Sequence, residues 1–541
     1  MLPSLLSVEL AQFQFAFVAL FHFVFVPLTL GLTWILFTME LMYVRTGKQV
    51  YKDMTRFWGK LLGINFAIGV LSGLTMEFSF GLNWAYYSQF VGDIFGTPLA
   101  IEGLVAFMLE SAFVGLFFFG WNKLSKKQHL ASTFCLAIGS SMSALLILVA
   151  NGYMQVPVGG HFVWETMRME TTSLATLFMN PIAQIGFAHT VLAGYTTAAV
   201  FVIGISAFFL LKKRDMGFAK RSMAIGLGFG LVSSIMLMFM GDQQGLNAYH
   251  NQPLKLAAIE AEWTTQTPPA NFNAITFPDQ SEQKNNIEIQ IPKVLGLLVT
   301  HSMETPVFGI KDILYNGYTR SDGVKVPAMT TQISQGAMAY DAMVKMRAGN
   351  ESPTVRATFE KYKNDIGFGM LLMRYVPKGE PLSSATAKQI HEAATSSVPN
   401  VASIFWTFRV MVGLGVLMFL MIIVGLITTI RNTTWDKRWM LRGMLYMIPA
   451  PWIACLCGWF VTEHGRQPWT VYNILPTTLS ASTLNAWDIL ATLILFILFY
   501  ALLIGVEMFL MFKFARLGPS ALHTNRYHFE KKNDANELGG K

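Results

Sequence analysis

Long, uninterrupted runs of apolar residues dominate this chain. A helix needs about 20 apolar residues to cross a bilayer, and about nine stretches approach or exceed that length. The pattern predicts an all-α polytopic membrane protein with nine transmembrane helices arranged in bundles. We expect the helices at Phe13–Met42, Phe57–Phe80, Pro98–Trp121, Leu130–Met154, Ile182–Leu211, Ser222–Met240, Val401–Ile430, Leu445–Thr462 and Ile489–Phe512.

Composition and charge refine this picture. Of 541 residues, 53% are hydrophobic and only 13% are charged, which is unlike a soluble domain. Lysine and arginine gather in alternate short loops, and the positive-inside rule therefore places the N-terminus outside and the C-terminus in the cytoplasm. The net charge of +8 thus reflects topology, and we expect no nucleic-acid partner. The basic groups are Arg45, Lys48, Lys52, Arg56 and Lys60; Lys123, Lys126 and Lys127; Lys212, Lys213, Arg214, Lys220 and Arg221; and Arg431, Lys437, Arg438 and Arg442.

One connection, Gly241–Asn400, is far too long for a passive loop. Its apolar run at 291–300 is too short to span a membrane, and a short helix is expected after Pro353. We interpret it as a module on the outer surface. The predicted organisation is helices one to six at 1–240, the outer loop at 241–400, helices seven to nine at 401–515, and a cytoplasmic tail at 516–541.

Ionisable side chains inside membrane spans are costly and usually mark a pathway or a bound group. Counted from the predicted span ends, four candidate ligands lie within about 15 Å of the outer face. Histidine with methionine is an axial pair for a low-spin haem, and an arginine nearby suits a haem propionate. A single buried histidine more often makes a core hydrogen bond, and Met411 is one of 31 methionines, so it is the joint placement that favours haem. The four are His22, His189, Met411 and Glu463, with Arg409 as the arginine.

Other metal sites agree less well with these residues. Zinc and di-iron sites in helices use close pairs such as HExxH or ExxH, and the sequence contains neither. Isolated ligands on separate spans are more typical of flat macrocycles held between helices.

Several motifs resemble subunit I of the cytochrome bd-type quinol oxidases, in the subclass with a long quinol loop. The motifs are FHFVFVPLTLG around His22, YKDMTRFWGKLLGINFAIGV, GLTMEF, GTPLAIEGL, KLAAIEAEW at Lys255–Trp263, and GRQPW at Gly465–Trp469. The resemblance covers essentially the whole chain. It implies a respiratory terminal oxidase of the bacterial cytoplasmic (inner) membrane that takes electrons from quinol and reduces oxygen to water.

The resemblance also implies cofactors, partners and site residues. A low-spin haem b would be held by His189 and Met411, with a high-spin haem b and a haem d beside it. His22 and Glu463 would ligate these two, and we favour His22 on haem d, although the family contains both arrangements and haem b can fill the same pocket. Subunit II and one or more small single-span subunits are the expected partners. Further implied roles are quinol binding by Lys255 and Glu260, propionate pairing by Arg466 and aromatic packing by Trp459.

Protons for water are expected from the inner side, because this conserves energy. Glu102 and Glu110 lie eight residues apart in the third predicted span, about 12 Å along a helix and about 80° around it. One groove therefore reaches both carboxyl groups. Ser140, Ser141 and Ser143 in the fourth span are expected to add hydroxyl groups to this route.

Two other classes of function stay open at this point. An ion-coupled transporter would use Glu102 and Glu110 as coupling sites, but it is usually built from two matching halves with interrupted helices, which we do not find. A b-type quinol dehydrogenase would pass electrons to another protein, and it predicts pairs of histidines on one helix, which the sequence lacks.

Overall fold

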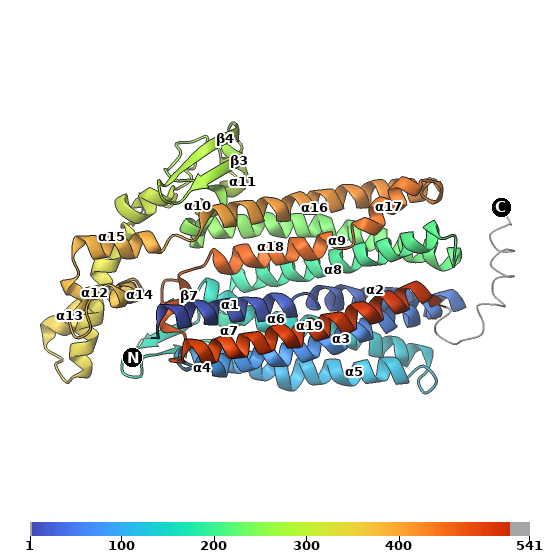
Figure 1. The fold of residues 1–541 in the computed structure, drawn as a ribbon, viewed down its shortest axis with the longest axis horizontal. Helices are drawn as coiled ribbons and strands as arrows, with labels where there is room; N and C mark the ends of the chain where they lie inside the picture. The colour runs from blue at the N-terminus through green and yellow to red at the C-terminus, as the bar shows by residue number, and fades with distance from the viewer. Residues whose placement is uncertain (1–2, 520–541) are drawn as a thin grey trace.

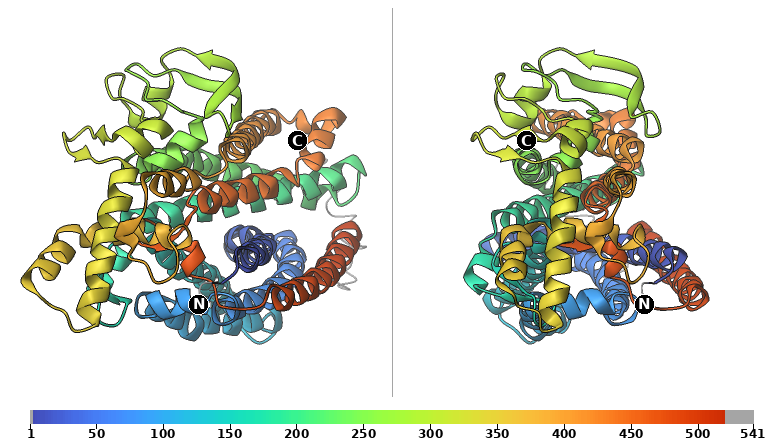
Figure 2. Two further views of the ribbon diagram at one scale, coloured as in Figure 1. Left: turned by 60° about the vertical axis from the view of Figure 1, so that its left-hand side comes forward. Right: turned by 90° about the vertical axis from the view of Figure 1, so that its left-hand side faces the viewer.

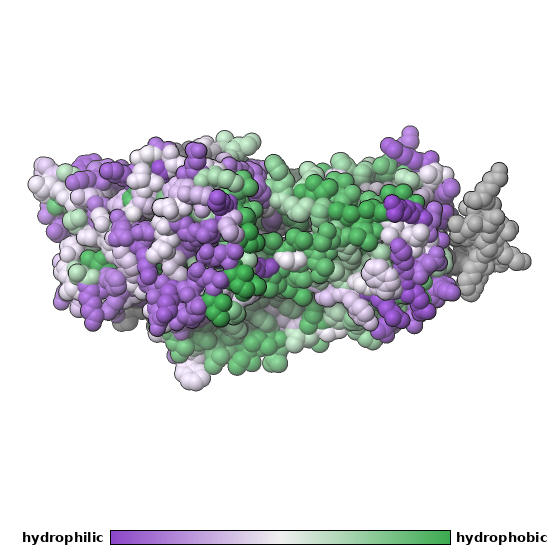
Figure 3. Space-filling view, turned by 90° about the horizontal axis from the view of Figure 1, so that it is seen from above, coloured by the Kyte–Doolittle hydropathy of each residue, from purple (hydrophilic) through white to green (hydrophobic). Residues whose placement is uncertain are grey.

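The computed structural model describes residues 3–519, and these form a long helical bundle with a smaller outer module at one end (Figure 1). Within the described residues, nine helical segments are long and apolar enough to cross a membrane, which confirms the predicted fold class. On the face shown in Figure 3, a broad apolar band covers the middle of the bundle, and hydrophilic residues gather at both ends. In the predicted cytoplasmic tail, residues 520–541 lie outside the described part of the chain.

The bundle is built from long helices joined by short connections. A two-stranded sheet and a short helix connect α6 to α8, and a second small sheet follows α18. The helices are α1 (Leu5–His22), α2 (Val26–Thr46), α3 (Gln49–Leu82), α4 (Ala85–Ile101), α5 (Met108–Phe119), α6 (Lys126–Gln155), α7 (Leu174–Phe178), α8 (Pro181–Leu211), α9 (Met216–Asn251), α16 (Val401–Ile430), α17 (Arg438–Tyr446), α18 (Ala450–His464) and α19 (Ala486–Leu517). The strands are β1 (Gly160–Val163), β2 (Arg168–Thr171), β7 (Trp469–Val471) and β8 (Leu475–Pro476).

Three of the predicted spans are interrupted. The first is two helices, because the chain leaves the helix at Phe23–Phe25 before Pro27 starts α2. The third contains the π-helical segment η1 (Glu102–Phe107) between α4 and α5. The eighth breaks before Ala450, where α18 begins beside Pro449. Apolar length predicts a span, but it does not reveal such breaks.

Helix α8 forms the centre of the bundle. Small residues let its neighbours approach closely, as is common between membrane helices. A Cβ atom on Gly31 of α2 would lie 2.3 Å from the carbonyl oxygen of Gly194 on α8, so no larger residue fits there. The surrounding core includes Leu32, Ile35 and Ala198, all fully buried.

The long connection between α9 and α16 folds into the outer module. Its helix α13 begins at Pro353, as predicted. The elements are α10 (Pro253–Glu260), β3 (Phe272–Asp279), β4 (Lys284–Ile291), α11 (Leu295–Thr300), β5 (Tyr318–Thr319), β6 (Lys325–Val326), α12 (Met329–Arg347), α13 (Pro353–Tyr362), α14 (Ile366–Met370) and α15 (Ala387–Ser396). Its short helical turns are η2 (Asp312–Asn316), η3 (Lys363–Asp365), η4 (Leu371–Arg374) and η5 (Leu382–Ser384). Two further turns belong to the bundle: η6 (Thr434–Asp436) follows α16, and η7 (Thr477–Leu479) follows β8.

The outer module is packed onto the bundle through a shared hydrophobic core. Leu256 and Ile259 of α10 and Ile333 of α12 belong to the same buried cluster as Ile404 and Phe405 at the start of α16. Figure 2 shows the module lying across the ends of the helices. Side chains of the module are therefore held in fixed positions relative to the membrane helices.

Candidate functional site

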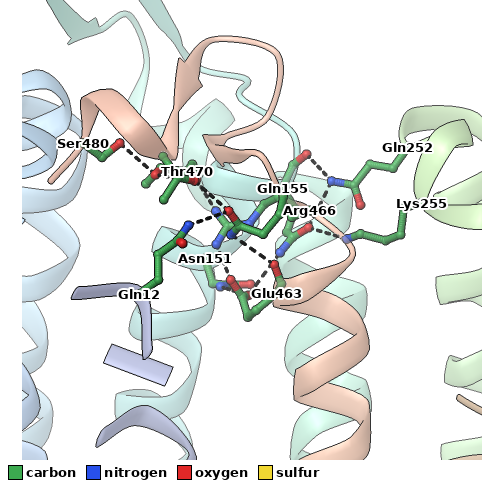
Figure 4. Close-up of polar contacts among 11 residues, drawn as sticks. Gln12, Asn151, Gln155, Gln252, Lys255, Glu463, Arg466, Thr470 and Ser480 are labelled. Carbon is green, nitrogen blue, oxygen red and sulfur yellow. Dashed lines mark hydrogen bonds and ion pairs between the residues drawn. The ribbon is translucent and has the colours of Figure 1, made fainter. Parts of the chain in front are cut away.

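Glu463 lies at the centre of a polar network at the C-terminal end of α18 (Figure 4). Asn151 and Gln155, one turn apart on α6, donate to its Oε1 atom at 2.9 and 3.2 Å. Arg466 donates to its Oε2 atom and also to the carbonyl oxygen of Thr470. Both carboxylate oxygens of Glu463 are thus oriented, one by side chains of α6 and the other by Arg466 in the turn that follows α18.

Lys255 connects the outer module to this network. Its Nζ donates to Oε1 of Gln155 at 2.8 Å, and Gln252 donates to the same oxygen at 3.0 Å. The side chain is buried, which contradicts the usual expectation of a solvated lysine on an outer helix. Burial lowers the pKa of Lys255 to about 7; Glu463 opposes this shift, whereas Arg466 adds to it.

A second buried cluster joins the other end of α10 to α16. NH2 of Arg409 lies 2.9 Å from Oε2 of Glu260, and NH1 donates to the carbonyl oxygen of Ile259 at 2.6 Å. Burial raises the pKa of Glu260, and the guanidinium of Arg409 opposes that rise. Nearby Glu262 has its pKa raised to about 8, chiefly by burial. Helix α10 therefore places one buried cation and one buried carboxyl group against two different membrane helices.

His189 on α8 and Met411 on α16 each face a glycine. Nδ1 of His189 is buried and has no hydrogen-bond partner within residues 3–519. A Cβ on Gly241 would lie 3.4 Å from Cε1 of His189, and one on Gly458 would lie 2.9 Å from Sδ of Met411. Both candidate ligands therefore pack directly against glycine backbone, where a larger residue would displace them.

His22 is the last residue of α1, directly before the break in the first span. Its Nδ1 lies 2.9 Å from Oγ of Ser72 on α3. Helix α1 begins at Leu5 rather than at Phe13, so His22 lies about 26 Å from the start of its helix. Two residues later, Val24 accepts a 2.7 Å hydrogen bond from Trp452 of α18.

The third predicted span turns both of its carboxyl groups toward α6. Ser143 donates to Glu102 at 2.7 Å, and Ser140 donates to Glu110. The π-helical segment η1 lies between the two glutamates, so the angle predicted for a regular α-helix does not apply. Ser141 does not join them, because it accepts a hydrogen bond from Trp34 at 3.2 Å.

Aromatic and amide side chains complete the surroundings. Trp459 packs edge-on against Phe23 at the break in the first span, with ring centroids 5.2 Å apart. Asn151, Gln155 and Gln252 are not among the site residues predicted from the sequence. Asn151 and Gln155 could have been found from the sequence, because they are two polar residues at helical spacing near the end of an apolar run.

Fold and site together define a polytopic helical membrane protein that brings isolated ligating side chains to gaps between helices. Residues 10–519 match the family described as cytochrome bd terminal oxidase subunit I. The chain therefore belongs to this family and is subunit I of a respiratory terminal oxidase, an enzyme of the quinol:oxygen oxidoreductase class. This membership removes the transporter and the b-type dehydrogenase as alternatives.

Individual relatives agree along almost the whole chain. Cytochrome bd-II ubiquinol oxidase subunit 1 of Escherichia coli (strain K12) is 47% identical over 519 residues, covering 96% of this chain and 98% of that protein. Cytochrome bd ubiquinol oxidase subunit 1 of Bacillus subtilis (strain 168) is 34% identical, with coverage of 96% and 95%. The solved bd oxidase from Geobacillus thermodenitrificans shares the fold, with a TM-score of 0.73 at 20% identity, over 94% of this chain and 98% of that one.

Enzymes of this family contain haem, and the residues present fit such groups. Besides the unpartnered nitrogen of His189, the Nε atoms of Arg409 and Arg466 are buried without a partner within residues 3–519. Buried donors of this kind suit the propionates of a macrocycle. Histidine, methionine and carboxylate side chains on separate helices are an appropriate donor set for haem iron.

Proposed function

We propose that this protein oxidises quinol at the outer face of a bacterial cytoplasmic (inner) membrane and reduces oxygen to water with protons from the inside, generating a proton motive force. The position of helix α10 is the observation that carries the proposal. It holds Lys255 against the Glu463 network and Glu260 against Arg409, two residues from Met411. A quinol site in the outer module would thus adjoin both groups of candidate ligands.

The proposed ligands are distributed over four helices. His189 and Met411 would hold a low-spin haem b, His22 a haem d, and Glu463 a high-spin haem b. When bound, these groups supply electron transfer and oxygen reduction. Arg409 and Arg466 would direct their unpaired Nε atoms at propionates, while Ser72 and Asn151 orient His22 and Glu463. Trp459 would pack beside the macrocycles.

Proton release and uptake would use opposite faces of the membrane. Burial favours the protonated form of Glu260, and Arg409 favours the ionised form, so this carboxyl group can accept a quinol hydroxyl proton and release it outside. Glu110 and Glu102 would pass protons from the inner side along α6. Electrons and protons then separate across the membrane.

Partners follow from the family. Members work with other subunits, and we propose subunit II together with one or more small single-span subunits. The N-terminus would face outward, because the basic loops lie at the opposite end from the outer module.

Absorption spectra test the cofactor assignment. A reduced-minus-oxidised spectrum of the purified enzyme is expected to show b-type bands and an added red-shifted chlorin band. Pyridine haemochrome analysis of the extracted groups would then give both haem types. Recovery of haem b alone would contradict the haem d assignment while leaving the family membership intact.

A pair of variants tests the proposed quinol site. Lys255→Ala and Glu260→Gln are expected to slow quinol oxidation by about tenfold or more, because each removes a buried proton-exchanging group. Oxygen reduction driven by an artificial reductant should remain normal, with all haems bound. The glutamine variant is chosen because it keeps a side-chain oxygen beside the buried Arg409, whereas an alanine would remove this hydrogen bond altogether.

Matched controls for this pair lie in the same module. Lys388 and Glu392 on α15 form an exposed pair at 3.9 Å, so Lys388→Ala and Glu392→Gln should leave the quinol rate unchanged. Loss of haem from the Lys255 or Glu260 variant would show that α10 is structural, and the quinol site would have to be sought elsewhere.

A further inference from the structure

A row of polar side chains on α6 bonds carboxyl groups from other helices at successive levels of the bundle. Thr133 donates to Glu40 at 2.5 Å, and Asn151 donates to Glu463 at 2.9 Å. Between them, Ser140 and Ser143 bond Glu110 and Glu102, as described above. Thr133 and Asn151 are 18 residues apart, about 27 Å along the helix. The proposed function uses every carboxyl group of this row except Glu40.

Glu40 on α2 pairs with His129, in the first turn of α6. Nδ1 of His129 lies 2.6 Å from Oε1 of Glu40, and Nε2 lies 3.0 Å from the carbonyl oxygen of Phe117. Because a carbonyl oxygen only accepts, Nε2 carries a hydrogen. One proton is therefore shared between Nδ1 and Oε1, giving either imidazolium with carboxylate or imidazole with carboxylic acid.

The pair is buried but lies close to one end of the bundle. Glu40 is 1% exposed and His129 is 2% exposed, yet α6 begins only three residues earlier, at Lys126. The Trp121 ring covers His129 at a centroid distance of 3.8 Å, and Nζ of Lys52 lies 5.3 Å from that ring. Lys52 and Lys126 belong to the basic loops, which we propose to face inward.

Structural packing alone gives little reason for this pair. A buried ion pair in a membrane helix is expensive, and ionisable groups kept at such positions commonly serve as proton relays. Between the pair and Ser140, the hydroxyl of Ser132 is buried and has no hydrogen-bond partner within the described residues. Ser132 precedes Ser140 by eight residues, about 12 Å along α6.

We propose that the His129–Glu40 pair is the inner entry of the proton route that runs along α6 to Glu110. A proton taken from inner-side water leaves both groups protonated, as imidazolium beside carboxylic acid. Release of one proton toward Ser132 and Glu110 restores the starting pair, so one proton enters and one leaves in each passage. This inference rests on the proposed uptake of protons from the inner side.

Proton uptake by the complete enzyme in oriented vesicles tests this entry. Glu40→Gln keeps the side-chain shape but removes the exchangeable carboxyl proton. Inner-side proton uptake and oxygen reduction are expected to slow by about tenfold or more. Haem spectra and quinol-driven haem reduction should be unchanged. Ser141→Ala is the matched control, because it removes a hydroxyl of α6 that bonds Trp34 and no carboxyl group, so its uptake rate should stay near normal.

Glu110→Gln, measured alongside, separates this inference from the proposed function. Slow uptake in Glu110→Gln with normal uptake in Glu40→Gln overturns the entry and leaves the route from Glu110 in place. Normal uptake in both variants removes the route and the entry together. If Glu40→Gln does not assemble, His129→Ala is measured with and without added imidazole. Recovery of uptake with imidazole supports the entry, and absence of recovery overturns it.

Discussion

Replacing Glu110 with glutamine is expected to slow oxygen reduction by about a hundredfold, because a positioned carboxyl group that transfers protons is lost. Inner-side proton uptake should slow in parallel, while quinol still reduces the haems quickly. The measurement is proton uptake during turnover in oriented vesicles, combined with stopped-flow spectra of haem reduction. Uptake at the normal rate would show that protons do not pass through Glu110.

Neighbouring variants sharpen this result. Ser140→Ala removes the hydroxyl that donates to Glu110 and should slow uptake partially, whereas Ser141→Ala is a matched control because Ser141 binds Trp34 instead. Glu102→Gln should slow turnover and also shift the haem d spectrum. An unchanged spectrum in Glu102→Gln would separate Glu102 from the oxygen site.

The Met411→Leu enzyme is expected to lose its low-spin haem b signal. Leucine fills nearly the same volume but lacks the thioether sulfur, so the iron should become high-spin or bind external ligands. The midpoint potential of this haem should fall, since methionine favours ferrous iron. Redox titration followed at the low-spin bands measures both effects.

Met418→Leu provides the matched control, because this buried methionine lies two turns further along α16. Its spectrum and potential should match those of the unmodified enzyme. Survival of the low-spin bands in Met411→Leu would mean that His189 has a different axial partner.

The positions of the spans were predictable because they depend on local apolar length. Apolar length does not show the breaks, although a proline stands beside two of them, Pro27 in the first turn of α2 and Pro449 before α18. Phe23–Phe25 leaves the helix within an apolar run, and its carbonyl groups are satisfied by side chains from distant helices. The π-helical segment after Ile101 has no marker in the apolar pattern either.

The candidate site was predictable by residue type but not by contact. The motifs singled out Lys255, Glu260 and Arg409, yet their burial and pairing arise from the packing of the outer module. A lysine and a glutamate five residues apart look like surface charges in the sequence. Only the folded module shows that Lys255 reaches Gln155, an amide 100 residues earlier in the chain.

The break in the first span also has a consequence for how the enzyme is made. The carbonyl oxygen of Val24 is bonded by Trp452, which is 428 residues further along the chain. At about 5–20 residues per second, the ribosome needs on the order of tens of seconds to reach that tryptophan. During this time the segment after His22 has one of its two side-chain hydrogen-bond partners, Asn65, and lacks the other. The surroundings of His22, the first proposed ligand in the sequence, are therefore completed only near the end of synthesis, so we expect haem to be held stably there only after the chain has been almost wholly inserted into the membrane.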